Sequence, residues 1–146
     1  MSTYSSTATW TKRRSGIVDT EAVHLPIVFS APVEFQGEPG AWTPEHFLAA
    51  AAAGCFLTTF MAIAELSKFE AIALKVTAEG VLEKVDRGFQ FTRIVIRPEL
   101  TIAHEADQER ALRLLEKAER ACLISRSLRS EVVLEPRVLL EAPVPA

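Results

Sequence analysis

The side chains best suited to covalent chemistry are two thiols, Cys55 and Cys122, the only cysteines in the 146-residue sequence. Cys122 is followed within a few residues by Arg126, and a nearby cation stabilises a thiolate. Two other charged features stand out. One is the basic pair at residues 13–14, and the other is Glu45, which lies a short way before Cys55.

Two thiols, a guanidinium and a carboxylate are the parts needed to reduce a peroxide. An arginine lowers the pKa of a thiol and steadies the departing oxygen, while a glutamate orients the arginine. A second thiol converts the resulting sulfenic acid to a disulfide before it is oxidised further. Spacing alone does not bring these groups together. The simpler interpretation is that each cysteine is a small buried apolar residue.

A long helix over residues 43–66 must position Cys55. Thr43 suits the N-cap, and Pro44 suits the first helical position because its missing N–H costs nothing there. Glu45 in the first turn is favoured by the positive end of the helix dipole. Residues 47–64 are uncharged and leave almost no polar stripe, so we expect this helix to be covered on nearly every side.

The uncharged run is close to the length of a membrane span. However, residues 49–54 are weakly hydrophobic and the rest of the chain alternates like a soluble protein, which favours a buried core helix. One sheet and a second helix cover only part of such a helix. A second copy of the chain most easily covers the rest, so we expect a homodimer with a large apolar interface and no membrane contact.

The remaining elements predict an α+β fold. The first forty residues read as a β-meander, with strands at 3–12, 17–21 and 24–29 and another within 32–40. After the helix come a hairpin, a second helix, a short helical turn and a last strand, at 71–100, 105–121, 124–128 and 131–140. This order predicts one domain over residues 1–146, with antiparallel sheets packed on helices.

The composition narrows the function further. A net charge of −3 gives no concentrated basic surface for nucleic acid. Residues 1–10 are polar and contain no signal-peptide block, so we expect a cytoplasmic protein in which the thiols are free or redox-active. The two cysteines form no CxxC pair and the three histidines are scattered, so we expect no metal site.

Three motifs stand in order along the chain: GEPG at 37–40 continuing to PE at 44–45 and CF at 55–56, LEKVDRGF at 82–89, and AERACLIS at 118–125. As a set they resemble the OsmC/Ohr family of thiol peroxidases. The hairpin motif resembles that of the osmotically inducible OsmC branch. Each motif is weak alone, but together they span nearly the whole chain.

The resemblance implies an OsmC-like α+β fold, assembled as an intertwined homodimer with two active sites at the interface. It implies that Cys55 is the peroxidatic thiol, that Cys122 is the resolving thiol, and that Glu45 pairs with a catalytic arginine. The family reduces organic hydroperoxides and is typically recycled by dithiols such as lipoyl groups. No bound cofactor or metal is therefore expected, and a dithiol reductant protein is the expected partner.

The chain departs from the family pattern at two points. Leu123 stands where the family usually has proline after the second cysteine, which bears on the geometry and pKa of Cys122. In Ohr-type members the arginine lies in an early Arg-x-Gly turn, which residues 14–16 match. In OsmC-type members it comes from the strand before the central helix, where this chain has Glu34. We assign the role to Arg14; the alternative is a surface turn charge.

Two other functions stay open at this point. In one, the protein is a non-catalytic binding protein that holds an apolar ligand at the dimer interface. Trp42 and Phe47, at the start of the helix, are either core residues or one wall of an apolar pocket, and such a pocket would favour alkyl or fatty hydroperoxides over hydrogen peroxide. In the other, Cys55 is the acyl nucleophile of a hydrolase or transferase, but no histidine stands at a recognisable position to serve as its base.

Overall fold

The computed structural model describes residues 1–142 and divides the chain into two compact units, Met1–Leu48 and Ala49–Ala146. The boundary falls inside one helix, α1 (Pro44–Leu66). The prediction of one domain over residues 1–146 stays a prediction.

The first unit is built on a three-stranded antiparallel sheet with the order β1-β2-β3. Its strands are β1 (Thr7–Lys12), β2 (Ser15–Thr20) and β3 (Val23–Ser30), which confirms the predicted meander. The prediction of a strand within residues 32–40 is wrong. This segment forms a short 3-10 helix, η1 (Val33–Phe35), because the amides of Phe35 and Gly37 bond back to the Pro32 carbonyl at 2.8 and 3.0 Å instead of extending the sheet.

A close backbone approach fixes the loop after η1. A Cβ built on Gly37 would lie 1.6 Å from the carbonyl oxygen of Ala31, so the position accepts no larger residue without moving the backbone. The next amide, of Glu38, donates to the buried hydroxyl of Ser30 at 2.8 Å. The glycine of the first sequence motif is therefore required by packing inside the first unit.

Helix α1 begins as the sequence predicts. The Thr43 hydroxyl accepts a hydrogen bond from the His46 amide at 3.0 Å, and the Thr43 carbonyl accepts the Phe47 amide at 3.0 Å. At the other end Lys68 adopts a left-handed conformation with φ of 53°, and the Phe69 amide bonds the Ala64 carbonyl at 2.8 Å. The chain can then reverse into the next strand.

The second unit contains a four-stranded sheet. Its centre is a long antiparallel hairpin of β4 (Ala73–Val85) and β5 (Gly88–Ile102). Two short strands, β6 (Glu131–Leu134) and β7 (Arg137–Leu140), then pair with β5 in parallel. The α+β class is confirmed, but this sheet is mixed rather than antiparallel, because a helical crossover returns the chain to β5 in the same direction. The single strand expected at 131–140 is split at Pro136, which has no N–H for the ladder.

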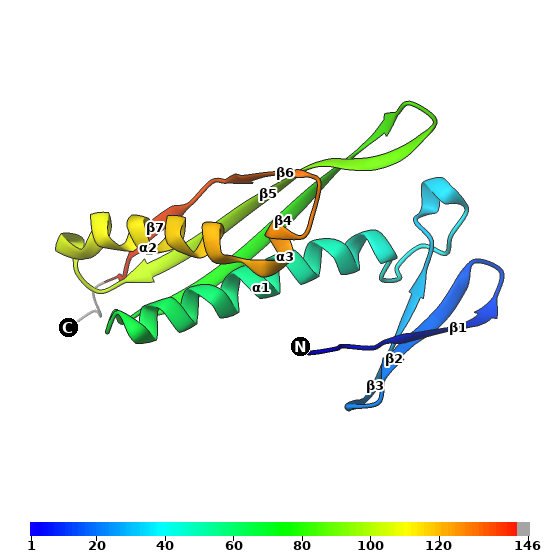
Figure 1. The fold of residues 1–146 in the computed structure, drawn as a ribbon, viewed down its shortest axis with the longest axis horizontal. Helices are drawn as coiled ribbons and strands as arrows, with labels where there is room; N and C mark the ends of the chain where they lie inside the picture. Colours follow the sequence, from blue (N-terminus) through cyan, green and yellow to red (C-terminus); the bar gives the residue numbers. More distant parts are fainter. Residues whose placement is uncertain (143–146) are drawn as a thin grey trace. The chain divides into compact units, whose positions relative to one another are not determined.

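One hydrophobic core joins the elements of the second unit. The crossover contains η2 (Glu105–Asp107), α2 (Gln108–Ala121) and α3 (Leu123–Arg126). Figure 1 shows α1 and α2 running along the β4–β5 hairpin. Side chains from α1, β5 and α2 fill the space between them, and the fully buried ones include Phe56, Phe60, Ile94, Ile96, Ala111 and Leu115.

The single chain covers only one stripe of α1. Its buried residues are Ala52, Phe56, Phe60 and Ala64, at the four-residue spacing of one helix face. The opposite face is exposed and carries mainly small or apolar side chains, namely Ala50, Ala51, Gly54, Thr58, Met61 and Ala62. We call this surface the open face of α1. The expectation of cover on nearly every side is therefore not met within one chain, because its one sheet and short second helix reach only one stripe.

Gly37→Ala is expected to destabilise the protein by about 1–3 kcal/mol, because the added methyl group must displace the Ala31 backbone. Urea unfolding followed by circular dichroism measures this change. Gly88→Ala is the matched control, because a Cβ at Gly88 meets nothing within 4 Å. Equal unfolding midpoints for the two variants would contradict the close approach at Gly37.

Candidate active site

Cys55 lies in the middle of α1, next to the buried stripe and one turn before Thr59. Its side chain is half-buried at the edge of the core. The Cys55 Sγ and the Thr59 Oγ1 are 3.8 Å apart. When the sulfur is a thiolate, the threonine hydroxyl is the donor of this contact. The Cys55 sulfur thus lies at the edge of the core, with the Thr59 hydroxyl beside it.

Cys122 lies at the junction of α2 and α3 and is fully buried. It ends α2 in an extended conformation, with φ of −64° and ψ of 112°, and forms the N-cap residue of α3. The Ser125 hydroxyl, one turn later, donates to the Cys122 Sγ at 3.4 Å. Ser125 is itself only 8% exposed. The resolving thiol named by the family resemblance therefore lies in the core with a hydroxyl donor.

The structure brings the two thiols together. Cys122 lies close enough to Cys55 for its side chain to lower the pKa of Cys55, although the two residues are far apart in the sequence. Both cysteines are free thiols. Packing of α1 and α2 against the same core creates this contact, which is why spacing alone did not reveal it.

The environment of Cys55 favours its thiolate. Burial raises the pKa of Cys55, but hydrogen bonds to its sulfur from the Ile124 amide, the Cys122 side chain, the Thr59 hydroxyl and the Leu123 amide together outweigh it. The pKa of Cys55 is therefore below its ordinary value. A thiolate is the form that attacks an electrophile, so this shift makes Cys55 more reactive than an ordinary cysteine.

Leu123 was expected to affect Cys122. Its backbone amide instead affects Cys55. The extended conformation of Cys122 is one that a residue before proline favours, so the backbone here is compatible with a proline at position 123. A proline has no N–H, whereas the Leu123 amide reaches the Cys55 sulfur. The departure from the family pattern thus adds a donor to Cys55.

Glu45 lies in the first turn of α1, as expected. One of its carboxylate oxygens, Oε2, is buried and has no hydrogen-bond partner among the described residues. The ten positions from 45 to 55 correspond to about 15 Å along a helix axis, so Glu45 and Cys55 of one chain are about three turns apart. Buried polar atoms are normally paired, which marks Oε2 as an acceptor awaiting a donor.

Arg14 lies in the first unit, in the turn between β1 and β2. Its guanidinium is exposed and donates from Nη1 to the Phe35 carbonyl at 3.3 Å. The neighbouring Arg13 has a left-handed φ of 46°. Its Nη1 atom lies 3.9 Å from the Oε1 atom of Glu38. Among the ion pairs of the described residues, none joins Arg14 to Glu45. Within the first unit the two predicted partners are therefore not paired.

Aromatic side chains gather where α1 begins. Trp42 and Phe47 stack with ring centroids 5.9 Å apart, and Phe29 contacts Phe47 edge-on at 5.9 Å. Trp42 is 52% exposed and lines a shallow depression of about 320 Å³ together with His46. Trp42 and Phe47 therefore form a stacked pair, but of the two only Trp42 lines the depression, so the wall expected from both residues stays a prediction.

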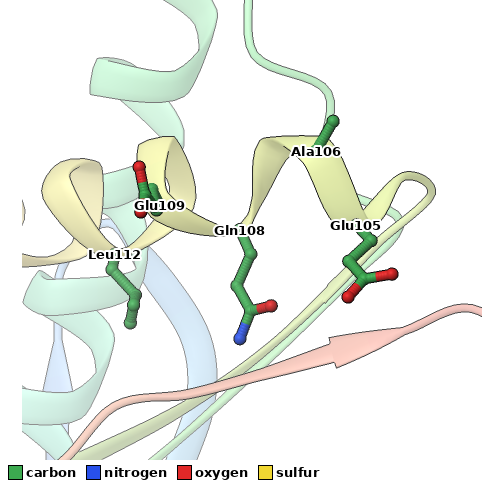
Figure 2. A pocket seen from close by; sticks show the side chains of 5 residues that line it. All are labelled: Glu105, Ala106, Gln108, Glu109 and Leu112. Atoms are coloured by element: carbon green, nitrogen blue, oxygen red, sulfur yellow. The ribbon is translucent and has the colours of Figure 1, made fainter.

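A second depression, of about 500 Å³, lies at the start of α2 and is shown in Figure 2. Glu105, Gln108 and Glu109 line it together with Ala106 and Leu112. It contains no thiol and lies at the opposite end of α2 from Cys122. No cluster of three or more His, Cys, Asp or Glu side chains within residues 1–142 is arranged to hold a metal ion.

Sequence reasoning did not assign roles to the groups that surround the thiols. Thr59 lies four residues after Cys55, and Ser125 lies three residues after Cys122. The first is a helical spacing that places two side chains on one face, and the second is the spacing between an N-cap residue and the third residue of its helix. These spacings are the signals that would have found them. The backbone amides of Leu123 and Ile124 leave no such trace in a sequence.

The lowered pKa of Cys55 can be tested by measuring the rate of Cys55 alkylation at different pH values, with mass spectrometry as the readout. Only the thiolate reacts, so the midpoint of the rate in the folded protein is expected at lower pH than in the urea-unfolded chain. Leu123→Pro removes one amide donor and keeps the backbone shape, so it is expected to move the midpoint to higher pH. Leu123→Ala keeps the N–H and is the control. A midpoint unchanged by proline would contradict the role of this amide.

The chain matches the family model described as OsmC-like protein over residues 37–137. The uncharacterized protein YmaD of Bacillus subtilis is 32% identical over 140 residues, which cover 94% of this chain and 91% of that protein. Peroxiredoxin OsmC of Escherichia coli is 32% identical over 127 residues, which cover 85% of this chain and 86% of that protein.

Solved structures agree with this match. An organic hydroperoxide resistance protein OsmC from Legionella pneumophila superposes with a TM-score of 0.74 at 26% identity, covering 95% of this chain and 99% of that one. The names of these relatives support a peroxide-related role for the protein. The fold, the matched motifs and the relatives agree, and the chain belongs to the OsmC-like protein family.

Proposed function

We propose that the protein is a cysteine-based peroxidase that reduces organic hydroperoxides through Cys55 and Cys122. The observation that carries the proposal is the proximity of a half-buried thiol, whose pKa is lowered, to a second, fully buried thiol that helps to lower it. A binding protein has no need for such a pair. The peroxide-related names of the relatives point to the same chemistry.

The proposed reaction has two steps in the protein. The Cys55 thiolate attacks the terminal oxygen of the hydroperoxide and the O–O bond breaks. The alkoxide leaves and takes up a proton, which gives an alcohol and a Cys55 sulfenic acid. The Cys122 sulfur then attacks the sulfenic sulfur, the S–O bond breaks, and water leaves as the disulfide forms. An external dithiol, of the lipoyl type, returns both thiols to the reduced state.

Arg14 and Glu45 are proposed to assist the first step. The guanidinium would steady the oxygen that leaves, and the carboxylate would orient the guanidinium. The buried, unpartnered Oε2 of Glu45 supports this assignment, because a buried carboxylate oxygen needs a donor. The Arg14 contact with the Phe35 carbonyl is exposed, so solvent can replace that carbonyl when the guanidinium moves.

We also propose that the protein is a homodimer in the cytoplasm, where thiols stay reduced. The open face of α1 supports the dimer, because a contiguous apolar surface of this kind is uncommon on a monomer. Helix α1 has the length and composition of a membrane span as well. Its fully buried Phe56 and Phe60, packed against the sheet, favour an interface helix instead.

Peroxide consumption tests the proposed activity, with cumene hydroperoxide or hydrogen peroxide as substrate and dihydrolipoamide as reductant. The wild-type protein is expected to prefer the organic peroxide, and Cys55→Ser is expected to be inactive because the attacking sulfur is gone. Cys122→Ser is expected to turn over once and then accumulate the Cys55 sulfinic acid, which mass spectrometry detects. Thr58→Ser, on the open face beside Cys55, is the control for the helix.

An inert wild-type protein whose Cys55 stays reduced in excess peroxide would reject this function. The alternative function, binding of an apolar ligand without catalysis, would then be tested next. Full activity in Cys55→Ser would reject Cys55 as the attacking group while leaving the reaction itself in place.

Sedimentation equilibrium tests the dimer. Met61 lies on the open face and is 42% exposed in the single chain, so a charge there costs little in a monomer. Met61→Glu is expected to shift the dimer toward monomer at least tenfold, because the interface would bury the carboxylate. Met61→Leu is the control and should leave the dimer intact. A monomeric wild-type protein would contradict the proposal.

A further inference from the structure

The family pattern assigns a role to both thiols but does not explain what prepares Cys122 for the second step. Cys122 is fully buried, so water does not solvate its sulfur. Among the described residues, the Ser125 hydroxyl is the donor that points to this sulfur, at 3.4 Å. The sulfur must carry negative charge as it attacks, and a buried charge needs a hydrogen-bond donor.

The backbone holds Ser125 in place for this contact. The Arg126 amide bonds the Cys122 carbonyl at 3.1 Å, and the Leu128 amide bonds the Ser125 carbonyl at 3.2 Å. These two bonds fix the turn that separates Ser125 from Cys122. Ser125 is 8% exposed, so little water competes for its hydroxyl. The direction of the O–H toward sulfur is therefore built into the turn.

The contacts form a chain that changes during the reaction. In the reduced protein Ser125 donates to Cys122, and Cys122 lies close enough to Cys55 to lower the pKa of Cys55. Once Cys55 is a sulfenic acid, it no longer accepts the Cys122 proton as a thiolate does. Cys122 must then lose that proton, and the Ser125 hydroxyl is the donor that remains on its sulfur.

We propose that Ser125 is a positioning residue for the resolving thiol. Its hydroxyl holds the Cys122 sulfur toward Cys55 and stabilises the negative charge on this sulfur while the disulfide forms. The S–S bond forms as the S–O bond breaks, and the departing hydroxide takes up the proton that Cys122 gives up. Ser125 keeps its own proton throughout. The inference rests on the proposed function.

Rapid mixing with cumene hydroperoxide, followed by acid quench and mass spectrometry, separates the two steps. Ser125→Ala is expected to oxidise Cys55 at the wild-type rate and to form the disulfide about tenfold more slowly or worse, because one hydrogen bond to a charged sulfur is lost. Excess peroxide should then convert Cys55 to the sulfinic acid. A merely structural role would slow both steps or neither.

Two comparisons control the experiment. Ser127→Ala removes a hydroxyl from the same turn, one that donates to the Leu123 carbonyl at 2.7 Å, and should behave like wild type. Ser125→Thr and Ser125→Val have nearly the same shape and differ in the hydroxyl. Threonine should restore disulfide formation and valine should not. This pair decides the question even if the alanine variant does not fold. Equal disulfide rates in threonine and valine variants would overturn the inference.

A failure of the proposed function has a different signature. If peroxide leaves wild-type Cys55 reduced, diamide still closes a disulfide between neighbouring thiols, because a thiolate attacks it without any peroxide. Slower closure by diamide in Ser125→Val than in Ser125→Thr would support the role of Ser125 even then. Equal closure rates would reject it.

Discussion

The proximity of Cys122 to the sulfur of Cys55, which lowers the pKa of Cys55, depends on nearly every element of the second unit. Helix α1 reaches this contact because Phe56 and Phe60 hold it against the hairpin. Helix α2 reaches it because Ala111, Leu115 and Ala118 are buried in the same core. A closely packed interior transmits small displacements, so the distance between the two sulfurs follows the fit of these larger side chains. The reactive pair is thus a product of core packing rather than of a local motif.

The pKa of Cys55 reflects two opposing effects. Burial at the core edge disfavours a charged sulfur, and four hydrogen-bond donors favour it. Two of these donors are backbone amides at the start of α3, where the first amides of a helix have no partner within the helix. The extended conformation of Cys122 ends α2 and frees these amides toward α1. One break in a helix therefore both places the second thiol and activates the first.

Local rules predicted most elements, and contacts across the chain decided the rest. Thr43 and Pro44 gave the start of α1, because a cap acts within one turn. Strict alternation along residues 89–100 would put Phe91 and Ile94 on opposite faces. Both pack on the core, because a bulge between Arg93 and Phe91 adds one residue to β5. The identities of the thiols followed from the family motifs. The donors around them did not, since an amide is the same in every sequence and depends on the fold to aim it.

The proposed homodimer would account for two features of α1. A helix with one buried stripe normally carries polar side chains on the other side, yet the open face is almost entirely apolar. In its first turn, a buried carboxylate oxygen of Glu45 has no donor among the described residues. Each feature would destabilise an isolated chain, the first by exposing apolar surface and the second by leaving a polar atom unpaired. Both costs are removed if a second copy covers the helix and a guanidinium reaches the carboxylate. The proposed homodimer would therefore remove both costs at the helix that carries Cys55.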